Sequence, residues 1–214
     1  MSKLSPRLFA LTGYVEKGDS IVDVGCDHGL LSIYLYENKL CKNIIASDIN
    51  EKALQNAIEN ISKRQLNIKT VLSDGICNVE LEGINTLIIS GMGTGTILHI
   101  LEDRNRLTHI NKLIIQSNND HQLLRNELNK KGYYLQSETV TNDKNKWYVT
   151  CLFIKSSKKN SKKEIKYGYL NNLEYVKYLY DFNKKIYKKI PINNLLKKIE
   201  YIKLLKVLKK AIKK

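Results

Sequence analysis

Short runs of apolar residues recur along the first half of the chain, and a longer stretch with apolar positions at helical spacing follows most of them. The runs are rich in β-branched residues and bounded by polar residues, which is typical of buried parallel strands. They occupy residues 20–24, 43–47, 68–72, 86–90 and 112–116, and the helical stretches occupy 30–39, 50–65, 95–103 and 119–132. A further short helix is expected to begin with Ser5 as N-cap and Pro6 at its first position. This alternation predicts a doubly wound parallel α/β sheet with right-handed crossovers.

The pattern changes after residue 132. Residues 133–141 and 146–156 are predicted as consecutive strands joined by the turn-rich stretch 142–145, with no helix between them. An antiparallel pair therefore completes a seven-stranded sheet. A common dinucleotide-binding fold has six parallel strands, whereas five parallel strands followed by a hairpin is the arrangement of class I, Rossmann-like S-adenosylmethionine-dependent methyltransferases. We expect residues 1–155 to form such a domain.

The last sixty residues differ from the rest in charge. Residues 1–154 carry 17 Lys+Arg and 17 Asp+Glu, whereas residues 155–214 carry 19 lysines and 4 acids, so the tail supplies the whole net charge of +15. A coding bias toward lysine would act along the whole chain, so the imbalance favours a polyanionic partner over a merely solvated surface. After a charged linker at 156–164, apolar residues at helical spacing resume on both sides of Pro191. Residues 165–214 are predicted to form a basic α-helical hairpin or short coiled coil.

Composition excludes several classes of protein. The four cysteines show no CxxC spacing and the four histidines are scattered, so neither a metal site nor a disulfide framework is expected. No apolar run has membrane-spanning length, and the first residues lack the apolar core of a signal peptide. We therefore expect a reduced, cytoplasmic protein without a membrane partner.

The loop after the first predicted strand reads DVGCDHG at residues 23–29, where a ligand binds at the carboxyl ends of parallel strands. It is not the GxGxxG pattern of dinucleotide folds, because Asp27 stands where a pyrophosphate would need glycine, and its carboxylate would repel phosphate. The carboxylate of Asp23 or Asp27 would instead suit the cationic sulfonium and amine of S-adenosylmethionine. A bare structural turn is the alternative.

Two further acids end the next two strands. Asp48, about twenty residues on, is placed to accept hydrogen bonds from ribose hydroxyls. Asp74 can accept from an adenine amine, while the region of Gly75 leaves room for the ring. Either acid alone could be a helix cap or turn residue. Acids at three successive strand ends favour a nucleoside-bearing cofactor.

The ends of the fourth and fifth strands carry the remaining candidate residues. SGMGTGT at 90–96 would form a wall poor in side chains that admits a flat base, although it could equally be a helix start with Met92 in the core. QSNND at 116–120 offers the amides of Gln116 and Asn118 at the same rim, while Asn119 or Asp120 could cap the next helix.

These motifs together resemble one family, the bacterial tRNA (adenine(22)-N1)-methyltransferases. The resemblance covers most of the chain and includes LSPRL at 4–8, DVGCDHG at 23–29, SDIN at 47–50, SDG at 73–75, SGMG at 90–93, QSN at 116–118 and the segment 132–149. It implies a class I methyltransferase domain followed by a helical coiled-coil domain. Two positions depart from the family pattern: Ser117 stands where proline is expected, and Thr94 where glycine is expected.

The resemblance also implies roles for individual residues. Those implied for the cofactor are Arg7, Asp23, Gly25, Cys26, Asp27, His28, Gly29, Asp48, Ile49, Asp74, Gly75 and Gly91; those implied for the substrate pocket are Met92, Gly93, Gln116, Asn118 and Tyr148. Within the first set, residues 25–29 would border the methionine part of the cofactor. Arg7 would hold the cofactor carboxylate or an RNA phosphate. Tyr148 would either stack on a base or simply pack.

The implied reaction needs little from the protein besides orientation. N1 of adenine has its own lone pair, so no strong base is required, and holding it in line with the methyl group can supply roughly 7–11 kcal/mol. Asp27 is the expected catalytic residue, because a carboxylate would stabilise the cationic product. We expect tRNA as partner and favour a monomer. The alternatives are another RNA base or a small molecule as acceptor, a non-catalytic RNA-binding protein, or a tail that only dimerises.

Overall fold

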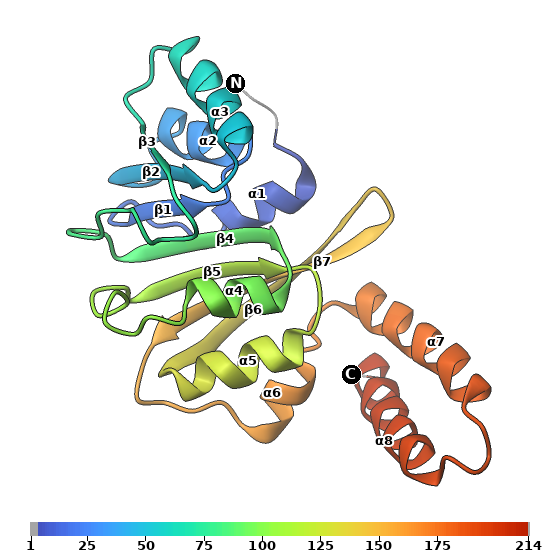
Figure 1. Ribbon diagram of the computed structural model, residues 1–214. Coiled ribbons are helices and arrows are strands. Elements are labelled where there is room, and N and C mark those ends of the chain that lie inside the picture. The colour runs from blue at the N-terminus through green and yellow to red at the C-terminus, as the bar shows by residue number, and fades with distance from the viewer. Residues whose placement is uncertain (1–3, 214) are drawn as a thin grey trace. The chain divides into compact units, whose positions relative to one another are not determined.

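The computed structural model describes residues 4–213 and contains a seven-stranded sheet with the strand order β3-β2-β1-β4-β5-β7-β6 (Figure 1). The strands are β1 (Ser20–Val24), β2 (Asn43–Asp48), β3 (Lys69–Leu72), β4 (Thr86–Met92), β5 (Lys112–Ser117), β6 (Tyr133–Asp143) and β7 (Lys146–Lys155). Neighbours among β1 to β5 pair in parallel, and β7 is antiparallel to both β5 and β6. This confirms the predicted sheet with its antiparallel last hairpin.

Helices cover the sheet and continue beyond it. They are α1 (Pro6–Thr12), α2 (Leu30–Glu37), α3 (Glu51–Ser62), α4 (Thr94–Ile100), α5 (His121–Lys130), α6 (Lys162–Tyr167), α7 (Leu173–Lys189) and α8 (Leu195–Ile212). One apolar core joins α1, α2 and α3 to inward-facing residues of the strands, among them Ile21, Ile88 and Ile114. Figure 1 shows α4 and α5 in front of the strands. Both faces of the parallel strands are thus covered, as their continuous apolar runs require.

The β6–β7 hairpin is longer than the rest of the sheet at one end. Pairing between β5 and β7 stops where Ser117 faces Val149, whereas β6 and β7 stay paired up to Asp143 and Lys146. The tip of this hairpin therefore projects past the carboxyl end of β5, visible as the yellow loop in Figure 1.

Part of the segment predicted as a linker is ordered helix. Ser161 and Glu164 form a capping box that starts α6, a signal of the form SxxE that the many lysines of this segment concealed. Just before it, the side chain of Asn160 bonds both the N–H and the carbonyl of Leu135 in β6. After it, Gly168 packs against the buried pair of Arg125 and Glu138, whose Nη2 and Oε1 atoms are 2.6 Å apart. These contacts attach residues 160–168 to the sheet domain.

The chain divides into two compact units, Met1–Gly168 and Tyr169–Lys214. In the second unit α7 and α8 pack against each other as the predicted helical hairpin, with Pro191 in the connection. The side chains of Asn172 and Asn194 cap the two helices. Residues 169–214 contain thirteen lysines and three acids. Among the described residues no helix combines the length and the apolar character that crossing a membrane requires.

Candidate cofactor and substrate site

The loop between β1 and α2 is held in a shape that few residues can adopt. Gly25, Asp27 and Gly29 all have positive φ angles, of 74°, 51° and 67°. The N–H groups of Gly25 and Cys26 both donate to the carbonyl of Ser47, which ties the loop to the end of β2. A Cβ at Gly25 would lie 2.2 Å from Met92 Cε, so glycine there gives both the backbone freedom and the space.

Asp48 is a fixed acceptor beside this loop. One carboxylate oxygen accepts the N–H of Asp27 and the other accepts the N–H of Asn50, both at 2.9 Å. The side chain is buried, and these bonds hold its orientation before any ligand arrives. Each oxygen retains lone-pair capacity for a further donor such as a hydroxyl.

Asp23 is the most deeply buried acid of the site. Its pKa is raised to about 6: burial raises it most, a 2.7 Å hydrogen bond from Ser32 Oγ opposes that rise, and the neighbouring charge of Asp48 adds to it. A cation bound next to this carboxyl group would favour its ionised form. Burial, followed by the charge of Asp23, also raises the pKa of the Cys26 thiol, so Cys26 contributes a neutral sulfur.

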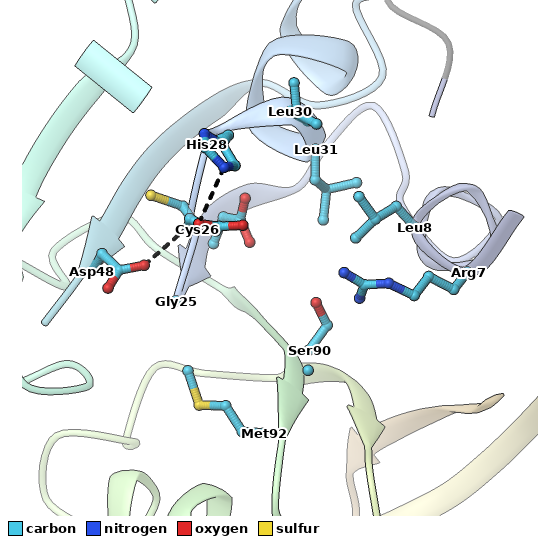
Figure 2. A pocket seen from close by; sticks show the side chains of 13 residues that line it. Arg7, Leu8, Gly25, Cys26, His28, Leu30, Leu31, Asp48, Ser90 and Met92 are labelled. Carbon is cyan, nitrogen blue, oxygen red and sulfur yellow. Dashed lines mark hydrogen bonds and ion pairs between the residues drawn. The ribbon is translucent and has the colours of Figure 1, made fainter. Parts of the chain in front are cut away.

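Asp27 and His28 differ from these two acids because they are open to solvent. His28 Nε2 lies 3.7 Å from Asp27 Oδ1, and both side chains are more than half exposed. Figure 2 shows His28 on the same side as Asp48, with Arg7 reaching in from α1 and Met92 on the side of β4.

These groups surround a cavity of about 330 Å³ at the carboxyl ends of β1, β2 and β4. It is within the usual size of ligand pockets. The predicted site residues that line it are Arg7, Asp23, Gly25, Cys26, Asp27, His28, Asp48, Gly91 and Met92. The prediction missed Leu8, Leu30, Leu31 and Ser90. Ser90 lies near the carboxyl end of β4 and could have been found by the strand-end argument that selected Asp48, whereas the leucines gave only a core signal.

Several other predicted residues lie outside the lining of this cavity. Asp74 is exposed at the end of β3, and the buried Gly75 packs against Ile100. Ile49 is 64% exposed. Gly29 turns the chain into α2 with its Cα close to Ala57 of α3. The remaining members of this group are Gly93, Gln116, Asn118 and Tyr148.

The amides of Gln116, in β5, and Asn118, just after it, both donate to backbone carbonyls. Gln116 is buried, and its Nε2 donates to the carbonyl of Arg7 at 3.0 Å and to Thr150 Oγ1 at 2.7 Å. Asn118 Nδ2 donates to the carbonyl of Gly91 at 2.7 Å. Gln116 thereby holds the start of α1 against the sheet, and Asn118 holds the loop after β4.

The two residues that depart from the family pattern contact each other. Thr94 Oγ1 lies 2.8 Å from Ser117 Oγ, and both hydroxyls also reach the carbonyl of Asn119. Both side chains are buried. The loops after β4 and β5 are thus joined by a hydroxyl pair.

The donor set of the cavity fits a cationic nucleoside. Asp48 provides fixed acceptors for hydroxyls, and Asp23 provides a buried acid that a cation would ionise. The loop around Gly25 gives the close backbone approach that such a ligand needs. Across residues 4–213, no group of three or more His, Cys, Asp or Glu side chains is arranged to hold a metal ion.

Comparison with known proteins agrees with this chemistry. The ribosomal protein L11 methyltransferase of Thermotoga neapolitana is 33% identical over 132 residues, which are 60% of this chain and 48% of that protein, so the chain spans about half its length. The structure of M. capricolum TrmK in complex with S-adenosyl-homocysteine has a TM-score of 0.84 at 29% identity, covering 99% of both chains. That of the B. subtilis M1A22 tRNA methyltransferase TrmK has a TM-score of 0.82 at 25% identity, covering 98% of this chain and 99% of the other.

A family model described as a methyltransferase domain matches residues 4–151. The match runs from the start of α1 into β7 and includes every residue that lines the cavity. Because it covers well over half of the sequence, the chain belongs to the family of methyltransferase-domain proteins.

Proposed function

We propose that this protein is an S-adenosylmethionine-dependent methyltransferase that acts on N1 of an adenine in tRNA, the adenine at position 22. The observation that carries the proposal is the acid-lined cavity at the carboxyl end of the sheet, in a chain that resembles two TrmK structures over nearly its whole length. Such a substrate places the protein in the cytoplasm, and we favour a monomer.

The residues that would hold the cofactor follow from the chemistry of each side chain. Asp48 would accept the ribose hydroxyls, and Asp23 would face the cationic methionine part, which the loop around Gly25 lets approach. Asp74 would accept the adenine amine at the open side of the site. When bound, S-adenosylmethionine supplies the methyl group and the positive charge that makes it transferable.

The protein itself contributes position and electrostatics to the reaction. The target adenine attacks with its own lone pair, so the walls of the cavity need only orient N1 at near-attack distance. The exposed carboxylate of Asp27 would stabilise the positive charge that the methylated ring acquires. Because N1 lies on the Watson–Crick edge, the base must leave its stack or pairing before it enters.

Two observations bear on which molecule accepts the methyl group. Among solved structures, a ribosomal protein L11 methylase covers 70% of this chain at a TM-score of 0.57, whereas the B. subtilis TrmK covers 98% at 0.82, including the lysine-rich helical unit. A strongly basic unit fits an RNA acceptor. Both observations favour tRNA over a protein substrate.

The test is methyl transfer from labelled S-adenosylmethionine to unmodified tRNA, with ribosomal protein L11 as a parallel acceptor, followed by nucleoside mass spectrometry. We expect 1-methyladenosine in the tRNA and no label in the protein. Asp48→Ala should lower the affinity for S-adenosyl-homocysteine at least tenfold, because a hydrogen bond to a charged group contributes about 1.5–3 kcal/mol.

Asp48→Ala also removes acceptors for two backbone N–H groups, so Asp48→Asn, which keeps one acceptor oxygen, is measured beside it. Asp103→Ala removes an exposed carboxylate that is remote in sequence from Asp48, and it serves as the matched control. Cofactor binding without label in any RNA would contradict the proposal and favour a small-molecule acceptor.

A further inference from the structure

Two cations lie against one aromatic ring near the tip of the β6–β7 hairpin. Arg7 Cζ is 5.8 Å and Lys146 Nζ is 5.0 Å from the centre of the Tyr148 ring. Arg7 also lines the cofactor cavity, so Tyr148 lies one side chain away from it. Tyr148 is half-buried and Lys146 is exposed.

The position of this group relative to the sheet gives it access to a large substrate. The paired residues Thr141 and Tyr148 lie beyond the last pair that β7 makes with β5. They therefore lie in the part of the hairpin that projects from the sheet (Figure 1), at the carboxyl edge of β5. The cavity lies at the same edge, at the carboxyl ends of β1, β2 and β4. A nucleic acid that inserts a base into the cavity would therefore pass close to the hairpin tip.

The tip is built as a rigid, positively charged platform. Its turn residues Lys144 and Asn145 have positive φ angles of 50° and 63°, the backbone of a tight two-residue hairpin turn. Asp143 is buried, so the exposed charges of the tip are those of Lys144 and Lys146. Residues 1–154 are charge-balanced as a whole, so these two lysines form a local basic corner within that part of the chain.

The backbone of Arg7 is hydrogen-bonded to the sheet. Gln116 donates from its buried amide to the Arg7 carbonyl and to Thr150 of β7, and so links α1 to the strand that carries Tyr148. The backbone of Arg7 is thereby held next to β7, with its guanidinium against the Tyr148 ring. Lys146 lies on the exposed side of the same ring.

We propose that Tyr148, Lys144 and Lys146 form an RNA-contact surface at the mouth of the cavity. An unpaired base of the tRNA stacks on the Tyr148 ring, and Lys146 leaves the ring to bind a neighbouring phosphate. Aromatic rings flanked by lysine are how proteins bind single-stranded nucleic acid, since every base has a face that can stack. This inference rests on the proposed function for the identity of the RNA and adds how the target base reaches the cavity.

The experiment compares Tyr148→Ala, Tyr148→Phe and Lys146→Gln in the full-length protein. Affinity for unmodified tRNA is measured by filter binding with S-adenosyl-homocysteine present, and Trp147, the single tryptophan of the chain, reports binding at the tip by fluorescence. Formation of 1-methyladenosine gives kcat and KM. Affinity for S-adenosyl-homocysteine is measured by calorimetry.

We expect Tyr148→Ala to weaken tRNA binding about tenfold, within the range for loss of base stacking, and Tyr148→Phe to recover most of that loss. Lys146→Gln should weaken binding and lower its salt dependence by about one phosphate contact. Affinity for S-adenosyl-homocysteine should not change in any of these variants.

The matched controls come from the same domain. Tyr134 lies near the other end of the hairpin with Lys158 Nζ 6.0 Å from its ring, so Tyr134→Ala removes a similar pair away from the cavity. Lys63→Gln removes an exposed lysine of the surface, which pairs with Glu59.

Each outcome separates this inference from the proposed function. Methylation of tRNA by Tyr148→Ala at the same rate and KM as Tyr134→Ala would overturn the contact surface and leave the function standing. Binding of tRNA that depends on Tyr148, in a protein that methylates none, would support the surface and remove the function. A fall in S-adenosyl-homocysteine affinity in Tyr148→Ala would also overturn the surface, because the ring would then act on the cavity.

Discussion

Asp23 shows how a single residue can couple the site to the stability of the fold. It is a buried carboxyl group in β1, with hydrogen bonds from the side chain and the backbone of Ser32 and the charge of Asp48 nearby. Burial makes its ionised form costly, so this acid gains most from a cation bound beside it. A bound sulfonium or ammonium group would offset that cost.

The raised pKa of Asp23 predicts a pH dependence of stability. Folding raises the pKa from 3.8 to about 6, so the folded state binds the proton more tightly, and stability falls as the pH rises from about 4 to about 6. Asn cannot ionise but still accepts the bond from Ser32. The free energy of unfolding of Asp23→Asn should therefore exceed that of the wild type by about 3 kcal/mol at pH 7, a difference that shrinks toward pH 4.

Urea denaturation at several pH values between 4 and 7 measures this difference. Asp103→Asn, which also removes one carboxylate but from the surface, is the control. If the two variants showed the same pH dependence relative to the wild type, burial of Asp23 would not be its cause.

At the scale of elements, the loops after β4 and β5 are joined by Thr94 and Ser117. Their hydroxyls lie 2.8 Å apart and share the carbonyl of Asn119 as acceptor. The N–H of Thr94 is also bonded, by Asn119 Oδ1 at 2.9 Å. Two positions that depart from the family pattern are thus parts of one local arrangement.

This contact predicts that the two positions are energetically coupled. Thr94→Val and Ser117→Ala should each lower the free energy of unfolding by about 1–2 kcal/mol, because each leaves buried partners unbonded. The double variant should lose less than the sum, by about 1 kcal/mol, since the pair is broken only once. Urea denaturation of the four proteins measures the cycle.

Ser32→Ala, at a buried serine of α2 remote in sequence from both loops, provides the comparison. Combined with Thr94→Val it should give additive losses. Additivity of Thr94→Val with Ser117→Ala as well would show that the hydroxyl pair does not act as a unit.

At the scale of the whole molecule, the two compact units, Met1–Gly168 and Tyr169–Lys214, differ in charge and in the chemistry they carry. Every residue lining the cavity belongs to Met1–Gly168, whereas residues 169–214 contain thirteen of the lysines and three acids. We expect the second unit to bind the tRNA backbone, in addition to the contact surface at the hairpin tip.

Removing residues 169–214 should therefore leave the affinity for S-adenosyl-homocysteine unchanged while tRNA affinity and its salt dependence fall. The cut after Gly168 matters, because Asn160 and α6 belong to the sheet domain. A chain ending at residue 159 is the comparison and should be less stable, since it lacks the bonds of Asn160 to Leu135. Calorimetry and filter binding at two salt concentrations make the measurement. Equal tRNA affinity of the full chain and residues 1–168 would contradict the assignment.

The whole-molecule fold was also the part most accessible to sequence reasoning. Apolar runs such as 20–24 and 112–116 coincide with β1 and β5 to within a residue, because a strand buried on both faces is apolar at most positions rather than at alternate ones. The placement of Asp48 followed from the same rule, since the carboxyl ends of parallel strands share one edge. Helix α6 was not predicted because lysines dominate its composition, although the capping box of Ser161 and Glu164 is visible in the sequence.

The sequence by itself thus determined the order of elements, the edge that carries the site and the acids at that edge, because these depend on local periodicity. Only the tertiary structure decided which distant side chains meet. It brings Arg7 to Tyr148 and Thr94 to Ser117, and it turns the amide of Gln116 toward the backbone of Arg7. Such contacts join residues far apart in the chain, and they form only when the helices and strands that carry them pack together.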